Sequence, residues 1–298
     1  KKIYIKTMPH KVFIFGEMLW DCLPSGSKAG GAPLNVALNL HQLGLNSNFI
    51  SAIGNDLDGE KLVEYIKSYG ISDKFIQRKD AYQTSKVLVD NSDPENIKYT
   101  ILPNVAWDHI SITDELIQAS QNCDAFIFGT LGVRSNESLK TLLALLPKQK
   151  LRIFDANLRS PFYDFEVIET LLGYTEILKI NEDELEIFAD YFNTEATVES
   201  LCEFLDHNFP IEIICITLGS KGAMIYQNGQ ITQHPGYKIK VKDSIGAGDA
   251  FLSGFVKTYL DGKNSEEILD FACKIGAFVA TQEGGTPKYQ VSDINQIH

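Results

Sequence analysis

The chain has 298 residues, of which 44% are hydrophobic, and its formal net charge is −12. This length suits one large α/β domain or two small ones, and no uninterrupted apolar run approaches the length that spans a membrane. The negative charge argues against the phosphate backbone of nucleic acids as the main partner, so an anionic substrate would need a local positive patch.

The cysteines and residues 1–7 give information about the cellular compartment of the protein. The five cysteines are widely scattered and form no Cys-x-x-Cys pair. This pattern favours reduced thiols in the cytoplasm over a disulfide framework or a zinc site. Residues 1–7 precede Met8 and lack the apolar stretch of a signal peptide, so we interpret them as a leader or a remnant of recombinant expression. No repeat or linker divides the rest, which predicts a single domain over 8–298.

Short apolar runs alternate with helical patterns along almost the whole chain. Strands are predicted at residues 12–15, 125–128, 151–154, 176–180 and 211–217. Helices are predicted at residues 33–43, 59–69, 112–119, 136–146, 164–172, 182–191, 198–208 and 250–260. This alternation predicts an α/β fold with a mainly parallel central sheet and helices on both faces.

One region breaks the alternation. Residues 84–90 and 96–102 read as extended segments around the turn-rich pentapeptide 91–95, which predicts a hairpin. Residues 19–23 can add a further strand. A small antiparallel sheet cannot bury both of its faces alone. We therefore expect 19–23 and 84–102 to form a β lid, a homodimer interface, or both.

Polar residues or glycines follow all five strands predicted for the main sheet. In open α/β sheets ligands bind beyond the carboxyl ends of the strands, so these residues predict a polar cleft. Structural alternatives exist: Asn181 and Glu184 can form a capping box, and Asp155 and Arg159 can pair with each other. The residues in question, in chain order, are Gly16, Glu17, Asp21, Gly129, Thr130, Arg134, Asp155, Asn157, Arg159, Asn181, Glu184, Gly219 and Lys221.

The stretch Gly246-Ala-Gly-Asp249 is the most informative about chemistry, because it opens the last predicted helix. Its glycines let backbone N–H groups converge on an anion, and the helix N-terminus favours phosphate. Asp249 would repel that anion, but a carboxylate is useful there if it takes a proton from an attacking hydroxyl. An anion hole beside a base suggests phosphoryl transfer to an alcohol. The alternative is an ordinary turn in which Asp249 complements the helix dipole.

A second glycine motif, Gly30-Gly31-Ala-Pro-Leu-Asn35, also opens a predicted helix. The glycines permit close approach by a ligand, and Asn35 offers a donor and an acceptor to neutral hydroxyls. An ordinary loop–helix junction is the alternative. A P-loop, a dinucleotide fingerprint, a nucleophile elbow and zinc-ligand spacing among the histidines are all absent from the sequence.

Over residues 11–290 the sequence resembles the ribokinase-like (PfkB-type) carbohydrate kinases. The resemblance rests on Gly30-Gly31 with Asn35, on Asn181-Glu-Asp-Glu184, on Thr217-Leu-Gly219 and on Asp243-Ser-Ile-Gly-Ala-Gly-Asp249. Within that family, the stretches most like bacterial fructokinases are Gly16-Glu17, Trp20-Asp21, Phe128-Gly-Thr-Leu131 and Asp155-Ala-Asn-Leu-Arg159.

The resemblance implies a role for each matching residue. Asp249 would be the general base, and Gly246, Ala247 and Gly248 would form the anion hole. The implied sugar contacts are Asp21, Gly30, Gly31, Asn35 and Arg159. The implied nucleotide contacts are Asn181, Glu184, Thr217, Gly219 and Lys221. Glu184 would reach Mg²⁺ indirectly, and Asp243 and Ile245, beside the turn 283–285, would bind a monovalent cation such as K⁺.

Two positions depart from the family pattern. Ser244 stands where the family usually has Thr and keeps the hydroxyl, whereas the short segment from Asp21 to Gly30 weakens any inference about sugar contacts from the lid. The resemblance implies a cytoplasmic kinase that uses Mg-ATP and phosphorylates fructose, since one arginine does not make a phosphosugar site. The alternatives are a kinase for ribose, 2-keto-3-deoxygluconate or a nucleoside, or a non-catalytic sensor, which would not need Asp249.

Overall fold

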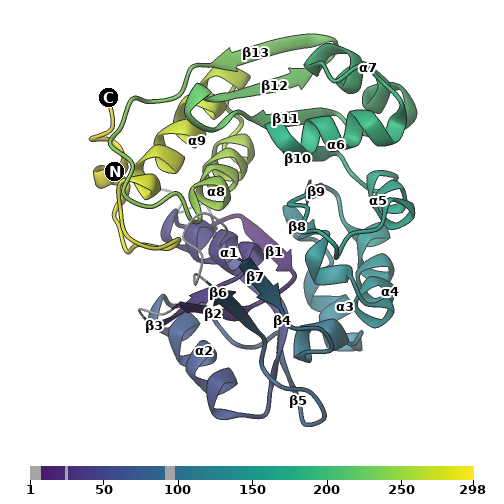
Figure 1. The fold of residues 1–298 in the computed structure, drawn as a ribbon, viewed down its shortest axis with the longest axis vertical. Helices are drawn as coiled ribbons and strands as arrows, with labels where there is room; N and C mark the ends of the chain where they lie inside the picture. Colours follow the sequence, from purple (N-terminus) through teal and green to yellow (C-terminus); the bar gives the residue numbers. More distant parts are fainter. Residues whose placement is uncertain (1–7, 24–25, 91–97) are drawn as a thin grey trace, which may run out of the picture.

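The computed structural model describes residues 8–23, 26–90 and 98–298. The strands of its main sheet are β1 (Lys11–Phe15), β4 (Asn46–Gly54), β5 (Ile76–Lys79), β8 (Ala125–Gly129), β9 (Arg152–Asp155), β10 (Ile177–Asn181), β11 (Ile213–Thr217), β12 (Ala223–Gln227) and β13 (Gln230–His234). Their order is β13-β12-β11-β10-β9-β8-β1-β4-β5 (Figure 1). Neighbours from β11 to β5 pair in parallel, and β12 and β13 are antiparallel additions at one edge. The predicted, mainly parallel sheet is confirmed.

Helices cover both faces of this sheet. They are α1 (Ala32–Gln42), α2 (Leu57–Ser68), α3 (Asp114–Ser120), α4 (Asn136–Leu145), α5 (Phe165–Leu172), α6 (Glu182–Phe192), α7 (Val198–Asn208), α8 (Ala247–Leu260), α9 (Ser265–Ala280) and α10 (Val291–Ile294), with short 3₁₀ turns η1 (Ala106–His109), η2 (Leu131–Val133), η3 (Leu146–Lys148) and η4 (Gly219–Lys221). One layer contains α1, α2, α8 and α9, and the other contains α3 to α7. The described part of the chain contains no helix long and apolar enough to cross a membrane.

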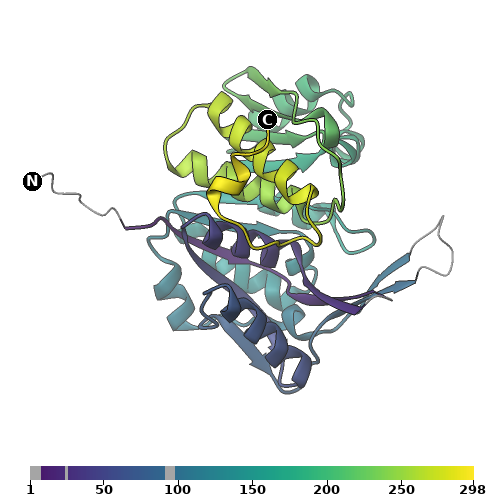
Figure 2. The same cartoon turned by 90° about the vertical axis from the view of Figure 1, so that its left-hand side faces the viewer.

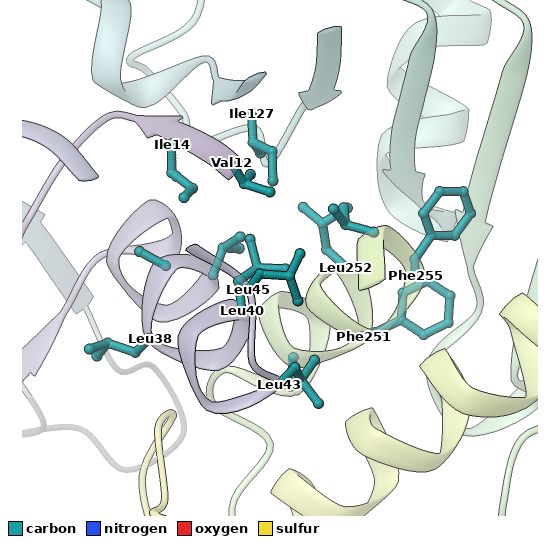
Figure 3. Packing of buried hydrophobic residues seen from close by; sticks show 14 of the residues in the cluster. Val12, Ile14, Leu38, Leu40, Leu43, Leu45, Ile127, Phe251, Leu252 and Phe255 are labelled. Carbon is teal, nitrogen blue, oxygen red and sulfur yellow. The ribbon is translucent and has the colours of Figure 1, made fainter. Parts of the chain in front are cut away.

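The strand β1, which lies inside the sheet between β8 and β4, shows why the sheet needs two helical layers. Val12 and Ile14 pack with α1 and α8 (Figure 3), whereas Phe13 and Phe15 belong to the core on the opposite face. All four side chains are fully buried. Successive side chains of a strand point to opposite faces, so a strand with four consecutive apolar residues must be covered on both sides.

The packing of α1 against α8 positions the two glycine motifs. Figure 3 shows Leu40 of α1 and Leu252 of α8 in the same cluster beneath the sheet. The Ser253 hydroxyl lies 3.3 Å from the carbonyl oxygen of Val36 and 2.8 Å from that of Asp249. Residues far apart in the sequence therefore meet where both helices begin.

The predicted small sheet is present and has four strands, β2 (Leu19–Leu23), β3 (Gly26–Gly30), β6 (Lys86–Asp90) and β7 (Lys98–Ile101), in the order β3-β2-β6-β7. The pairs β2·β3 and β6·β7 are antiparallel, and a parallel pair, β2·β6, joins them. In Figure 2 this sheet extends away from the main sheet. The turn 91–95 and the segment 1–7 lie outside the described residues.

Candidate active site

Asp249 lies in the first turn of α8, where its carboxylate faces α1. Asn35 Nδ2 donates a 2.8 Å hydrogen bond to Asp249 Oδ2, and Asn35 is only 6% exposed. Burial raises the pKa of Asp249 to about 6, although the bond from Asn35 lowers it. Such a carboxyl is ionised near neutral pH and still basic, which suits a general base.

The turn before Asp249 has the left-handed backbone that only glycine adopts without strain. Gly246 precedes α8 at φ 74°, and a side chain there would collide with the backbone of Gly285. Gly248 is exposed, and a Cβ built on it would have Lys179 Nζ as its nearest neighbour at 3.9 Å. The start of this 14-residue helix is therefore backed by Gly285 and lies beside a cation, an arrangement that favours an anion.

Lys179 is a functional candidate that the sequence prediction missed. It lies on β10 opposite Asp155 of β9, and its ammonium pairs with that carboxylate at 2.8 Å. Both residues are buried, at 6% and 5% exposure. Burial lowers the pKa of Lys179, but Asp155 and Glu184 outweigh burial and the net direction is upward. The sequence signal that could have identified Lys179 is the presence of a charged residue inside the otherwise mainly apolar strand Ile-Leu-Lys-Ile-Asn.

For the strand-end residues, the structure decides against one structural alternative and corrects one expectation. Asp155 pairs with Lys179 and not with Arg159. Arg134 was expected in the polar cleft, but its guanidinium pairs with buried Asp108 at 2.7 Å and stacks over the Trp107 ring at 4.1 Å. An arginine side chain is long enough to reach buried partners beneath the loop that carries it. The position of an arginine after a strand therefore does not determine where its guanidinium lies.

Three of the residues predicted to contact the sugar, Asp21, Gly30 and Arg159, lie near one another. A side chain on Gly30 would collide with the Asp21 carboxylate, and β2·β3 pairing holds both residues in one sheet. Burial raises the pKa of Asp21, and Arg159 lowers it. Arg159 itself is exposed and also lowers the pKa of Glu17 and Asp249, so its charge acts on three carboxyl groups.

Asn181 and Glu184 form the capping box that the sequence offered as their structural interpretation. Asn181 Oδ1 accepts from the Glu184 N–H at 2.8 Å, and Glu184 Oε2 accepts from the Asn181 N–H at 2.9 Å. Glu184 Oε1 accepts from the Leu158 N–H at 2.7 Å. Burial raises the pKa of Glu184, and Lys179 lowers it. Both residues hold the start of α6, and their nucleotide role stays a prediction.

The remaining residues predicted for the nucleotide lie beside this capping box. Thr217 ends β11 directly opposite Asn181 in the parallel register. Gly219 follows at φ 58° in η4, and Lys221 is exposed and paired with Glu182 of α6. The residues predicted for the nucleotide therefore lie together at one corner of the structure.

Asp243 connects the two turns expected to bind a monovalent cation. Its Oδ1 accepts from the Ile245 N–H at 3.0 Å and its Oδ2 from the Gly284 N–H at 3.1 Å. Next to Gly284, Glu283 pairs with Lys28 of the small sheet at 3.7 Å. Within residues 8–23, 26–90 and 98–298, no three His, Cys, Asp or Glu side chains are arranged to hold a metal.

Comparison with known proteins decides the family. Residues 24–291 match the family described as pfkB family carbohydrate kinase. The chain belongs to this family. It is 29% identical to the ATP-dependent 6-phosphofructokinase of Thermoanaerobacterium thermosaccharolyticum, over 93% of this chain and 90% of that protein. It is 25% identical to a fructokinase of Escherichia coli, over 93% and 95%.

A solved structure supports the fold of this PfkB-family kinase. A double mutant of the fructokinase from Vibrio cholerae O395, in the form that binds fructose, ADP and a potassium ion, superposes with a TM-score of 0.83 at 22% identity. The match covers 97% of this chain and 98% of that one. The predicted ribokinase-like fold and carbohydrate kinase family are thus confirmed.

Proposed function

We propose that this kinase transfers the γ-phosphoryl group of ATP to the primary hydroxyl of fructose. The observation that carries the proposal is Asp249, a carboxylate with a pKa of about 6, held by Asn35 at the start of α8. Curated relatives named fructokinase support fructose as the acceptor, among them the proteins from Escherichia coli and Solanum tuberosum.

In the proposed reaction Asp249 accepts the proton of the attacking hydroxyl. The hydroxyl oxygen forms a bond to the γ-phosphorus, the bond from that phosphorus to the bridging oxygen breaks, and ADP leaves with the electron pair. The N–H groups from Gly246 to Gly248 and the ammonium of Lys179 stabilise the charge on the transferred group. The protein positions the two substrates and stabilises charge, while the bonds to phosphorus that form and break are those of the acceptor and ATP.

Mg²⁺ would enter bound to the phosphates of ATP, where it neutralises charge. Both carboxylate oxygens of Glu184 already accept backbone N–H groups, so this residue fits a metal reached through water and not a direct ligand. We further propose that K⁺ binds between the turns that Asp243 connects, supported by the potassium ion of the Vibrio cholerae fructokinase.

Asp21, Gly30, Gly31, Asn35 and Arg159 are proposed to contact the sugar. Arg159 is the cation among the carboxyls of Asp21, Glu17 and Asp249. One cation among three acidic groups offers little net positive charge to a phosphosugar, which favours a neutral sugar. A second candidate acceptor is fructose 6-phosphate, because the relative of 29% identity is named a 6-phosphofructokinase.

The experiment is an assay of ADP release with Mg-ATP and one acceptor at a time: fructose, fructose 6-phosphate, ribose, 2-keto-3-deoxygluconate and a nucleoside. We expect fructose to give a kcat/KM at least about tenfold above every other acceptor, the effect of leaving one buried polar group of the site without its partner. A larger value for fructose 6-phosphate would replace the proposed acceptor. Calorimetric binding of fructose without ADP release from any acceptor would instead indicate a sensor.

Two further proposals concern the protein as a whole. Among the described residues, the strands β3 and β7 form the two outer edges of the small sheet, which suit pairing in a homodimer, and Leu88 of β6 is 47% exposed. Sedimentation velocity, with Leu88→Lys as the variant, tests this contact.

The five cysteines are all free thiols, which supports the proposed cytoplasmic location.

A further inference from the structure

The helix α1 carries three amide side chains along one face, and the proposed reaction uses only the first of them. The spacing i, i+4, i+7 places Asn35, Asn39 and Gln42 in one row. Asn39 is fully buried, although the other buried residues of this helix are mostly apolar. A buried amide costs free energy unless it is hydrogen-bonded, and asparagine is unfavourable inside a helix, so specific partners must account for Asn39.

Both ends of the Asn39 amide have a partner. Its Nδ2 donates to the carbonyl oxygen of Asn35 at 2.9 Å, and its Oδ1 accepts from the Tyr289 hydroxyl at 2.8 Å. Asn35 Nδ2 donates in turn to Asp249 Oδ2 at 2.8 Å. A continuous series of three hydrogen bonds therefore connects Tyr289 to the proposed base.

Tyr289 belongs to a C-terminal strap, residues 286–289, that α1 holds through the third amide of the row. Gln42 donates to the Pro287 carbonyl oxygen and accepts from the Tyr289 N–H, both at 3.2 Å. Tyr289 is 8% exposed, and burial raises the pKa of its hydroxyl. The hydroxyl therefore keeps its proton through the neutral range and remains a hydrogen-bond donor to Asn39.

Asn35 needs this support because α1 begins without a side-chain cap. Gly31, the N-cap of the helix, has no side chain to accept from the first N–H groups, and Asn35 lies one turn later. The bond from Asn39 ties the Asn35 backbone to the next turn of α1, and the bond from Tyr289 fixes the direction of the Asn39 amide. The orientation of Asn35 toward Asp249 therefore depends on a residue of the C-terminal strap.

We propose that Tyr289 and Asn39 are positioning residues for phosphoryl transfer: through Asn35 they hold the Asp249 carboxylate in the orientation in which it accepts the hydroxyl proton. The proposal rests on the proposed function, because it takes Asp249 to be the base. It gives a part in the reaction to the C-terminal strap, which lies beyond every motif predicted for the site.

The test compares Tyr289→Phe with wild type by steady-state ADP release with the preferred acceptor between about pH 5 and pH 9. The variant keeps the aromatic ring but leaves Asn39 Oδ1 without its donor. We expect kcat to fall roughly three- to tenfold, because the carboxylate is less well oriented, while the KM for Mg-ATP stays within about twofold. The acid limb of kcat/KM should move up by roughly half a pH unit, because the Asn35 bond that lowers the pKa of Asp249 is weakened.

Tyr69→Phe is the matched control. The Tyr69 hydroxyl, at the end of α2, donates to the Thr286 carbonyl oxygen at 2.6 Å, so this variant also removes a tyrosine bond to the strap but leaves Asn39 paired. We expect it to lower the midpoint of urea unfolding, as Tyr289→Phe does, and to keep the wild-type kcat and acid limb. Equal kinetics in the two variants, whether changed or unchanged, would overturn the proposal and assign both tyrosines to anchoring of the strap.

The double variant Tyr289→Phe with Asn39→Leu separates positioning from stability. It replaces both polar partners with apolar groups, a change that is close to neutral for stability, so the urea midpoint should return toward wild type. The kinetic change should persist, because the bond to the Asn35 carbonyl oxygen is still missing. Recovery of kcat together with stability would show that the two residues are structural only.

A measurement without turnover keeps this proposal separate from the proposed function. In ¹³C-carboxyl NMR we expect the signal that is lost in Asp249→Asn to titrate near pH 6 in wild type and at higher pH in Tyr289→Phe. The other charged groups that act on this carboxyl are the same in both proteins: Asp155, Lys179 and Arg159. An unchanged midpoint would refute the link between Tyr289 and Asp249. If the proposed function fails instead, wild-type protein releases no ADP with any acceptor while the NMR difference remains.

Discussion

The two sides of the candidate active site, which we propose to bind the acceptor and the nucleotide, use the same kinds of residue in different ways. On the acceptor side, the Asp249 carboxylate receives a side-chain bond from Asn35 and has a raised pKa. On the nucleotide side, both oxygens of the Glu184 carboxylate are occupied by backbone N–H groups. A carboxylate saturated by backbone donors holds a helix and a loop in place, whereas one with spare capacity in a buried site is available for proton transfer.

The largest expected effect is on the acceptor side. Asp249→Asn keeps the shape of the side chain but removes the base, so kcat should fall by roughly two to four orders of magnitude. Steady-state ADP release with a folding check by circular dichroism measures this. Asp261→Asn at the far, exposed end of α8 is the control and should keep kcat. Near-normal turnover of folded Asp249→Asn would show that the base is another group.

The ion pair of Lys179 and Asp155 lies between the two sides. Variants of this pair allow its contributions to stability and to activity to be measured separately. Lys179→Met leaves Asp155 buried without its partner, which should lower the free energy of unfolding by about 3–5 kcal/mol in urea titrations. The double variant Lys179→Met with Asp155→Leu should recover most of that stability. Its kcat should stay at least about tenfold low, since the cation beside Gly248 is missing. Recovery of kcat in the double variant would assign Lys179 to structure alone.

The raised pKa of Glu17 predicts a pH-dependent cost in stability. Its folded-state pKa of about 7 exceeds the ordinary 4.5, so the folded state holds this proton longer than the unfolded state. The stability that this proton contributes is complete below pH 4.5 and is lost as the pH rises through 7. Glu17→Gln should thus be more stable than wild type at pH 8, by up to about 3 kcal/mol, and similar at pH 4.5. Parallel stability curves from urea unfolding would contradict this.

The smallest effect separates the two roles of the capping box on the nucleotide side. Asn181→Ala should lower the free energy of unfolding by about 1 kcal/mol, and so should Asn264→Ala in the equivalent box of α9. Only Asn181→Ala should raise the KM for Mg-ATP, by roughly threefold or more, if Asn181 also orders the phosphates. Equal kinetics in the two variants would leave Asn181 as a cap without a nucleotide role.

Some elements that sequence reasoning passed over did have local signals. The strands β12 and β13 are joined at Asn228 and Gly229, both with positive φ, and Asn-Gly is a strong hairpin signal. The capping box of Asn264 and Glu267 marks the start of α9 in the same way. The strand β4 begins with the polar run Asn-Ser-Asn, so its apolar part appeared too short to be recognised.

The sequence by itself determined what depends on neighbours in the chain. The left-handed turn at Gly246, the start of α8 and the strand-end positions of Asn181 and Asp155 all follow from local residue types. Only the tertiary structure decided what depends on contact between distant segments. Asn35 forms a hydrogen bond with Asp249, which is 214 residues away in the sequence. Lys179 forms a buried ion pair with Asp155 instead of extending its ammonium into solvent. Burial and charge pairing are set by the packing of sheet and helices, so the raised pKa values of Asp249 and Glu17 exist only in the folded protein.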